Sequence, residues 1–203
     1  MPSRILLDEP YPENLPTVPA CASCNAEFSR DEEYFACLVE CALQGSIEMV
    51  QRPKIVRILK DKPLLAAKMA QSRIVGRNGV VTFKVEQDRV DRVILKLARG
   101  HAAFELSEPQ HGPPRHIYCA PLTSFSEETR DSFEGPPSPL MAAWPEVGSR
   151  AMMRCLVAEG YVYRSDWIDV QPGRYRFLSL AEGAVIIRIV LSEYLACEVV
   201  WEA

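Results

Sequence analysis

Residues 161–201, YVYRSDWIDVQPGRYRFLSLAEGAVIIRIVLSEYLACEVVW, carry the pattern that determines the fold class. Four segments in this stretch are rich in aromatic and β-branched residues: Tyr161–Val170, Tyr175–Leu180, Ala184–Leu191 and Leu195–Trp201. Such segments predict strands. Gln171-Pro172-Gly173-Arg174 joins the first two, and Pro followed by Gly at the central positions favours a type II turn. We therefore expect an antiparallel sheet in the region 148–203.

Helical patterns precede the sheet. Ser29 and Glu32 form a capping box that predicts a helix start, and Gly45 suits its end. The apolar positions of this helix recur at helical spacing: Tyr34, Cys37, Leu38, Cys41 and Ala42. A second helix is expected from Ser46 to about Lys60, kinked or broken at Pro53. We also expect a helix over Pro63–Ser72. A strand is expected over Val80–Val85, after the Asn78-Gly79 turn.

A long helix over Gln87–Leu106 has two contrasting faces. Its apolar face holds Val90, Val93, Ile94, Leu97, Ala98, His101 and Ala102. Its other side holds Arg89, Arg92, Lys96 and Arg99, at spacings that place them on one helical face. The apolar face predicts packing against the rest of the protein.

Residues 107–147 contain half of the 16 prolines, which indicates a loop-rich connector with a strand at His116–Leu122. The chain is thus expected to be α+β, with a helical middle and an antiparallel C-terminal sheet. The predicted regions are 1–45 (N-terminal segment), 46–106 (helical and basic), 107–147 (connector) and 148–203 (sheet).

Composition limits the function classes. The chain has 203 residues, with 48% hydrophobic and 25% charged, the balance of a soluble globular protein. No apolar run reaches the ~18 residues of a membrane helix, and the start lacks a signal peptide, so we expect a cytoplasmic protein without a membrane partner. Seven cysteines, an odd number, favour reduced thiols over a disulfide framework. Phosphate-binding glycine loops and hydrolase motifs do not occur.

Charge is distributed unevenly around an overall net of −4. Residues 51–100 carry a net +9 between acidic flanks. The candidate phosphate contacts in this block are Arg52, Lys54, Arg57, Lys60, Arg89, Arg92, Lys96 and Arg99. These residues either contact the phosphate backbone of a nucleic acid or form the solvent-exposed outer faces of helices.

Cys21-Ala-Ser-Cys24-Asn25 is the strongest chemical motif. A C-x2-C pair can place two thiolates on one metal ion. Because structural zinc takes four ligands, one such pair supplies half of a site.

The stretch from Leu15 to Tyr34, including Cys21-x-x-Cys24-Asn25 and Phe28-Ser29-x-Asp31-Glu32-Glu33-Tyr34, resembles bacterial HNH-endonuclease-like proteins. These are treble-clef zinc proteins that hydrolyse phosphodiesters in DNA. The resemblance implies that Cys21 and Cys24 hold a structural zinc with a second, upstream cysteine pair. It implies that Asn25 braces the loop carrying the catalytic His.

The resemblance covers residues 1–45 and includes only the second half of the motif, which implies a partial treble-clef zinc knuckle in this segment. Pro2-Ser3-Arg4 resembles the tail of an Asp-His-x-Pro-x-Arg element, so the general base would fall just before Met1, either through a mis-assigned start or in a truncated relic. The nearest candidates for the third motif residue, which helps to hold a catalytic divalent metal such as Mg²⁺, are Asp31 and Glu32. Without the base, this chain is expected to be inactive.

Alternatives remain for the cysteines and for the function. Cys37 and Cys41 either complete a self-contained zinc site with Cys21 and Cys24 or are small core residues; the shared apolar face favours the core. The protein could then be a non-catalytic module that binds nucleic acid or protein, or a zinc-stabilised scaffold.

The histidines offer no replacement base. His101 lies on an apolar helix face four residues before Glu105, which favours a structural role. His111 and His116 are expected to be exposed. Cys119, Cys155 and Cys197 lie in apparent strands and are expected in the core.

Overall fold

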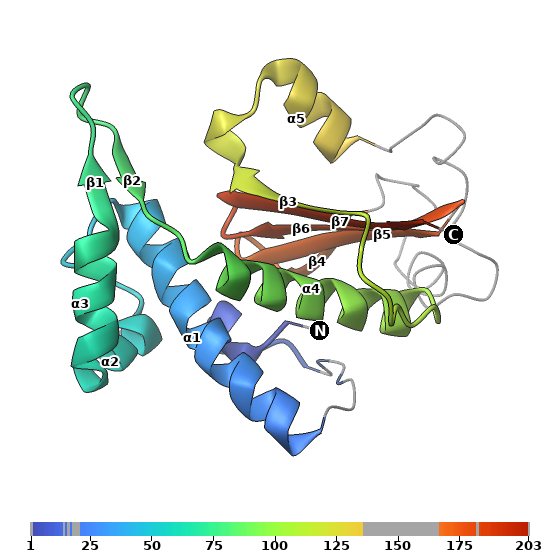
Figure 1. The fold of residues 1–203 in the computed structure, drawn as a ribbon, viewed down its shortest axis with the longest axis horizontal. Helices are drawn as coiled ribbons and strands as arrows, with labels where there is room; N and C mark the ends of the chain where they lie inside the picture. Colours follow the sequence, from blue (N-terminus) through green and yellow to red (C-terminus); the bar gives the residue numbers. More distant parts are fainter. Residues whose placement is uncertain are drawn as a thin grey trace. The chain divides into compact units, whose positions relative to one another are not determined.

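The computed structural model describes residues 2–13, 15, 17, 21–135, 167–181 and 183–202, apart from the side chain of Cys24. Within it the chain divides into two units (Figure 1). The sheet unit consists of Met1–Pro19 with Ile94–Ala203, and the helical unit is Ala20–Val93.

The sheet unit is built on five antiparallel strands in the order β3-β7-β6-β5-β4 (Figure 1). The strands are β3 (His116–Pro121), β4 (Ile168–Gln171), β5 (Tyr175–Ala181), β6 (Ala184–Leu191) and β7 (Leu195–Glu202). The predicted antiparallel C-terminal sheet is therefore confirmed. The turn between β4 and β5 also forms as expected, with Gly173 at φ 72° and a 3.0 Å hydrogen bond from Arg174 N to Gln171 O. Residues 136–166, which include Cys155 and part of the first predicted strand, lie outside the described residues.

Strand β6 is buried on both faces, which explains its nearly continuous apolar sequence. On one face, Ile189 pairs with Phe177 of β5, whose ring stacks on His101 of α4 (Gln87–Glu105). On the other face, Val190 clusters with Phe133 of α5 (Glu127–Glu134). The strand thus packs against a helix on each side.

Helix α5 was not expected, because the proline-rich composition around it indicates a loop. It begins at a short local signal, where the Ser126 hydroxyl accepts a 3.1 Å hydrogen bond from Thr129 N. It follows the 3-10 turn η2 (Leu122–Ser124). Its C-terminal end is bound by Arg188 of β6, whose Nη1 donates to the carbonyl oxygens of Ser132, Phe133 and Gly135 at 3.1, 2.8 and 2.9 Å.

The N-terminal segment packs on the turn between β4 and β5. It begins with η1 (Arg4–Leu6), and Leu6 and Leu7 are buried. Asp8 N donates to Gln171 Oε1 at 2.8 Å, and Gln171 Nε2 donates back to Asp8 O at 3.0 Å. The Asp8 carboxylate also pairs with Arg174. These contacts hold the segment around Asp8 against the turn between β4 and β5.

The helical unit contains α1 and the elements that pack on it. They are α1 (Ala22–Gln44), α2 (Pro53–Asp61), α3 (Pro63–Ser72), β1 (Arg73–Val75), β2 (Val81–Phe83) and the first turns of α4. Every residue of α1 from Tyr34 to Cys41 is buried. Helices α2 and α3 and strand β2 contact α1, which makes α1 the central element of this unit.

Two predicted boundaries in the helical unit are wrong. Helix α1 begins at Ala22 rather than at the Ser29 capping box. Ser29 lies inside the helix, where its hydroxyl donates to the Asn25 carbonyl at 2.8 Å, so a cap-forming residue is satisfied within the helix. The predicted helix from Ser46 starts only at Pro53, which occupies the first helical position instead of causing a kink. Strand β1 was missed, and it pairs with β2 through the predicted Asn78-Gly79 turn.

Helix α3 has its predicted bounds, and α4 ends one residue before the predicted Leu106. The predicted apolar face of α4 is fully confirmed, because all seven of its residues are buried.

We expect Arg188→Lys to weaken the attachment of α5 to the sheet. The arginine side chain is 7% exposed, and its Nε also donates to Glu198 at 2.6 Å. A lysine cannot supply this fork of donors. We expect the free energy of unfolding to fall by about 2 kcal/mol, the scale of lost buried charged hydrogen bonds. Urea unfolding measures that loss, and hydrogen exchange should become faster in α5.

Arg115→Lys is the control, because Arg115 forms an exposed ion pair with Glu202. Its effect should stay within about 0.5 kcal/mol. Equal effects of the two substitutions would contradict the role assigned to Arg188.

Candidate functional site

The cysteine motif lies at the start of α1. Cys21 is exposed immediately before the helix, and its carbonyl accepts a 2.9 Å hydrogen bond from Asn25 N. Its sulfur lies 3.2 Å from Ser23 Oγ. Position 24 falls in the first turn of the helix, and Asn25 is exposed in the same turn. A treble-clef zinc knuckle is not shown: the stretch after Cys21 is helical.

The structure separates Cys37 and Cys41 from this motif. Both are fully buried within α1. At a rise of 1.5 Å per residue, Cys37 lies roughly 20 Å along the helix from the Cys21 end. One zinc ion cannot bridge that distance, because Zn–S bonds are about 2.3 Å. The core interpretation of Cys37 and Cys41 is confirmed, and the four-cysteine site is not formed.

Burial also makes these two thiols poor ligands. It raises the pKa of Cys37 to about 12 and that of Cys41 to about 11. Both therefore remain protonated at neutral pH, whereas a metal ligand must be a thiolate. Among the side chains that the structure describes, no group of three or more His, Cys, Asp or Glu residues is arranged to hold a metal ion.

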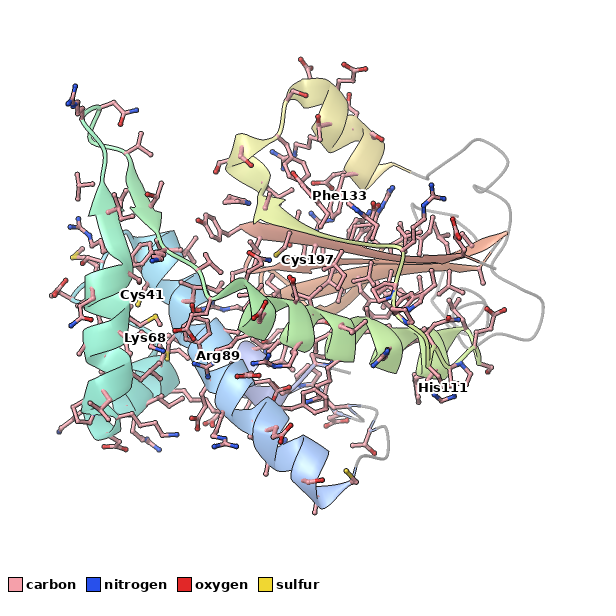
Figure 2. All side chains as sticks on the ribbon, viewed as in Figure 1. Cys41, Lys68, Arg89, His111, Phe133 and Cys197 are labelled. Carbon is pink, nitrogen blue, oxygen red and sulfur yellow. The ribbon has the colours of Figure 1, made fainter. Side chains whose placement is uncertain are left out.

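Asp31 and Glu32, the two candidates for the third residue of the HNH motif, are buried in α1. Glu32 is 6% exposed and Asp31 is 7% exposed. The two carboxylate oxygens of Asp31 accept hydrogen bonds from Arg89 Nε at 2.6 Å and from Arg92 Nε at 2.7 Å. Asp31 is thus already occupied by two guanidinium groups that join α1 to the start of α4. Of these residues, Arg89 is labelled in Figure 2.

Arg89 belongs to a larger cluster. Its guanidinium lies over the Tyr34 ring, 4.3 Å from the centroid, and also pairs with Glu86 at 3.3 Å. The Tyr34 hydroxyl accepts a 2.9 Å hydrogen bond from Glu86 N. The Glu86 carboxylate pairs with Lys68 of α3 as well, and hydrogen bonding from Lys68 lowers the Glu86 pKa. The cluster links α1, α3 and α4 within the helical unit.

Several predicted phosphate contacts are therefore bound to the protein itself. Arg52 is buried and pairs with Glu40 at 3.5 Å. Arg89 and Arg92 pair with Asp31, and Arg99 Nη2 donates to the carbonyls of His111 and Gly112 at 3.1 and 2.9 Å. Lys54 and Lys96 are half-buried, whereas Arg57 and Lys60 are exposed on α2. The eight residues therefore lie in different local environments.

The histidines are placed as expected. His101 is fully buried, with Nε2 2.8 Å from the Tyr175 hydroxyl and its ring stacked 3.9 Å from Phe177. Glu105 is also fully buried, while His111 and His116 are exposed. Cys197 is buried, and Cys119 opposite it is half-buried with a sulfur-to-sulfur distance of 3.0 Å.

Sequence reasoning missed one exposed basic element, the hairpin formed by β1 and β2. Arg73, Arg77 and Lys84 are exposed on it. The signal was present, because residues 73–85 contain these three basic residues and no acidic one. It was overlooked because β1 is only three residues long and was not expected as a strand.

Comparisons with protein-family models, curated proteins and solved structures found no match. No helix in the described part of the chain is long and apolar enough to cross a membrane.

We expect Asp31→Asn to destabilise the helical unit. Burial raises the Asp31 pKa, but hydrogen bonds and charges from Arg92 and Arg89 outweigh it, so the pKa lies below its usual 3.8. At pH 7, the loss should be about 1–3 kcal/mol of unfolding free energy. Because the pKa is lower in the folded state, the carboxylate's contribution is present above pH 3.8 and is lost as the pH falls through the folded pKa. The difference between wild type and variant should therefore shrink below about pH 4.

Urea unfolding at pH 7 and at pH 3 measures this difference. Asp61→Asn, at the exposed end of α2, is the matched control, with an expected effect within about 0.5 kcal/mol. A destabilisation by Asp31→Asn that is the same at both pH values would contradict the electrostatic explanation.

Proposed function

We propose that this protein is an HNH-endonuclease-like, DNA-binding protein in which residues 1–45 supply the second half of the nuclease motif. The observation that supports this is the exposed thiol of Cys21 directly before a long helix, with position 24 and Asn25 in its first turn. This arrangement leaves one thiol accessible to a metal ion, in contrast to the buried Cys37 and Cys41.

The residues present fit half of a structural zinc site. Cys21 and Cys24 would supply two thiolates, and the described residues offer no group that would complete the set of four. Zinc bound there would fix the start of α1 and hence Asn25, which braces the loop that carries the base in proteins of this kind. Asp31 is a poor ligand for a catalytic divalent metal such as Mg²⁺, because two arginines already occupy its oxygens.

The chain's own histidines do not replace the general base of an HNH site. His101 is buried against Tyr175 and Phe177, so water and a phosphodiester cannot reach its ring. His111 and His116 belong to other segments, outside the cysteine motif. Since general-base catalysis contributes about 10²–10⁴-fold, these 203 residues should bind DNA without cutting it efficiently.

Metal binding tests the role of the cysteines. We expect Co²⁺, a spectroscopic substitute for zinc, to give a thiolate-to-cobalt charge-transfer band with the full chain. The band should be lost in Cys21→Ser and in Cys24→Ser. Cys37→Ser is the matched control and should leave the band unchanged, because its thiol is buried and protonated. A wild-type chain without the band, or a band insensitive to Cys21→Ser, would contradict the zinc assignment.

A DNA assay tests the proposed activity separately. Supercoiled plasmid should be retarded by the protein at low salt and should remain supercoiled with Mg²⁺ or Mn²⁺ present. Nicking that exceeds a mock preparation would show that a base exists within these residues, against the proposal. DNA binding together with no cobalt band would instead favour the alternative of a non-catalytic nucleic-acid-binding module.

A further inference from the structure

We propose that the hairpin of residues 73–85, formed by β1 and β2, is the element of the helical unit that contacts duplex DNA. This inference rests on the proposed DNA-binding function and names the surface that carries it. It replaces the row of arginines on α4 as the principal contact.

Charge is the first argument. Arg73, Arg77 and Lys84 give this hairpin a net +3 without any acidic residue. Arg77 and Lys84 are exposed, and within the described part of the chain neither forms an ion pair. Arg92, by contrast, is already paired with Asp31. A phosphate can therefore bind to the hairpin without breaking an existing ion pair.

The turn holds its basic tip in a defined geometry. Gly76 N donates to Val80 O at 2.8 Å, and Gly79 N donates to Gly76 O at 3.0 Å. The Asn78 side chain accepts from Val80 N at 3.2 Å, and Gly79 has the positive φ of 77° that the turn requires. Arg77 lies within this turn. The hairpin of β1 and β2 extends away from α3 (Figure 1).

Exposed apolar side chains are the second argument. Ile74, Val75, Val80 and Val85 are between 41% and 54% exposed. Strand register places Ile74 opposite Thr82, and Val80 and Lys84 share that face by alternation. A face on which apolar, hydroxyl and basic groups alternate suits a DNA groove, where cations meet phosphates and apolar groups contact sugars and base steps.

The way in which the hairpin is attached supports a role in contacting DNA rather than in forming the core of the helical unit. Only Val81 and Phe83 are half-buried on its inner side. Lys84 N donates to Ser72 O at 2.7 Å, and Arg73 Nε donates to Gly45 O at 2.7 Å, which holds the base of the hairpin to α3 and to the end of α1. The base is fixed, and the outer face stays available for a partner.

The test compares two pairs of charge-removing substitutions in the full chain. Arg77→Gln with Lys84→Gln changes the hairpin. Arg57→Gln with Lys60→Gln removes the same charge from the exposed face of α2 in the same unit. Binding to a fluorescent 25-base-pair duplex is measured by anisotropy over a series of salt concentrations, and circular dichroism checks that each variant is folded.

We expect the hairpin pair to weaken binding about tenfold at 0.1 M salt and to reduce the slope of log K against log salt by about 1–2. The α2 pair should change both quantities less. Ile74→Ser with Val80→Ser should weaken binding while leaving the slope unchanged, because it removes no cation.

The possible failures are distinguishable. If wild type binds the duplex and the hairpin pair binds equally well, the hairpin inference is overturned while the proposed function stands. If wild type does not bind DNA, both are overturned. Anionic phosphatidylserine vesicles are the second probe: hairpin-dependent binding to vesicles but not to DNA would assign this surface to a lipid membrane and overturn the inference.

Discussion

The paired contacts of Asp31 with Arg89 and Arg92 are the interaction on which the helical unit depends. Asp31 lies on α1, which is almost fully buried in its middle, and the arginines lie on the first turns of α4. Removal of this buried carboxylate would take away the acceptor that Arg89 and Arg92 share, and Arg89 would keep only Glu86 and the Arg30 carbonyl. The same contacts engage Arg89 and Arg92 within the protein, so a structural constraint also shapes the proposed binding surface.

This constraint explains why the charge pattern was ambiguous in the sequence. Arg89 and Arg92 are separated from Asp31 by about 60 positions, and periodicity within α4 cannot reveal such a partner. Arg77 and Lys84 belong to the same basic block but have no acidic neighbour in the hairpin. Local sequence therefore places a cation on a helix face or a turn, and only tertiary structure shows whether it is neutralised.

The elements that could be predicted from sequence are the long ones with a consistent period. The last three C-terminal strand segments, which form β5, β6 and β7, and the apolar face of α4 are set by side chains that must be buried together. The predictions were wrong where a local sequence signal, such as a helix cap, was outweighed by the tertiary packing around it. Ser29 has the sequence of a cap, but the helix extends back to Ala22, and the serine hydroxyl bonds to the Asn25 carbonyl within it. Strand β1 and helix α5 are short, and tertiary packing contributes much of their stability.

The cysteines show how one residue type takes different chemical roles in one helix. Cys37 and Cys41 have pKa values of about 12 and 11 because burial disfavours the thiolate, and this makes them core residues. Cys21 lies exposed immediately before the same helix. Of the motif's two thiols, that of Cys21 is therefore exposed to solvent. The Cys21 thiol and the exposed cations of the hairpin belong to different ends of the helical unit's sequence, so the proposed metal binding and the proposed DNA binding can be tested by separate substitutions.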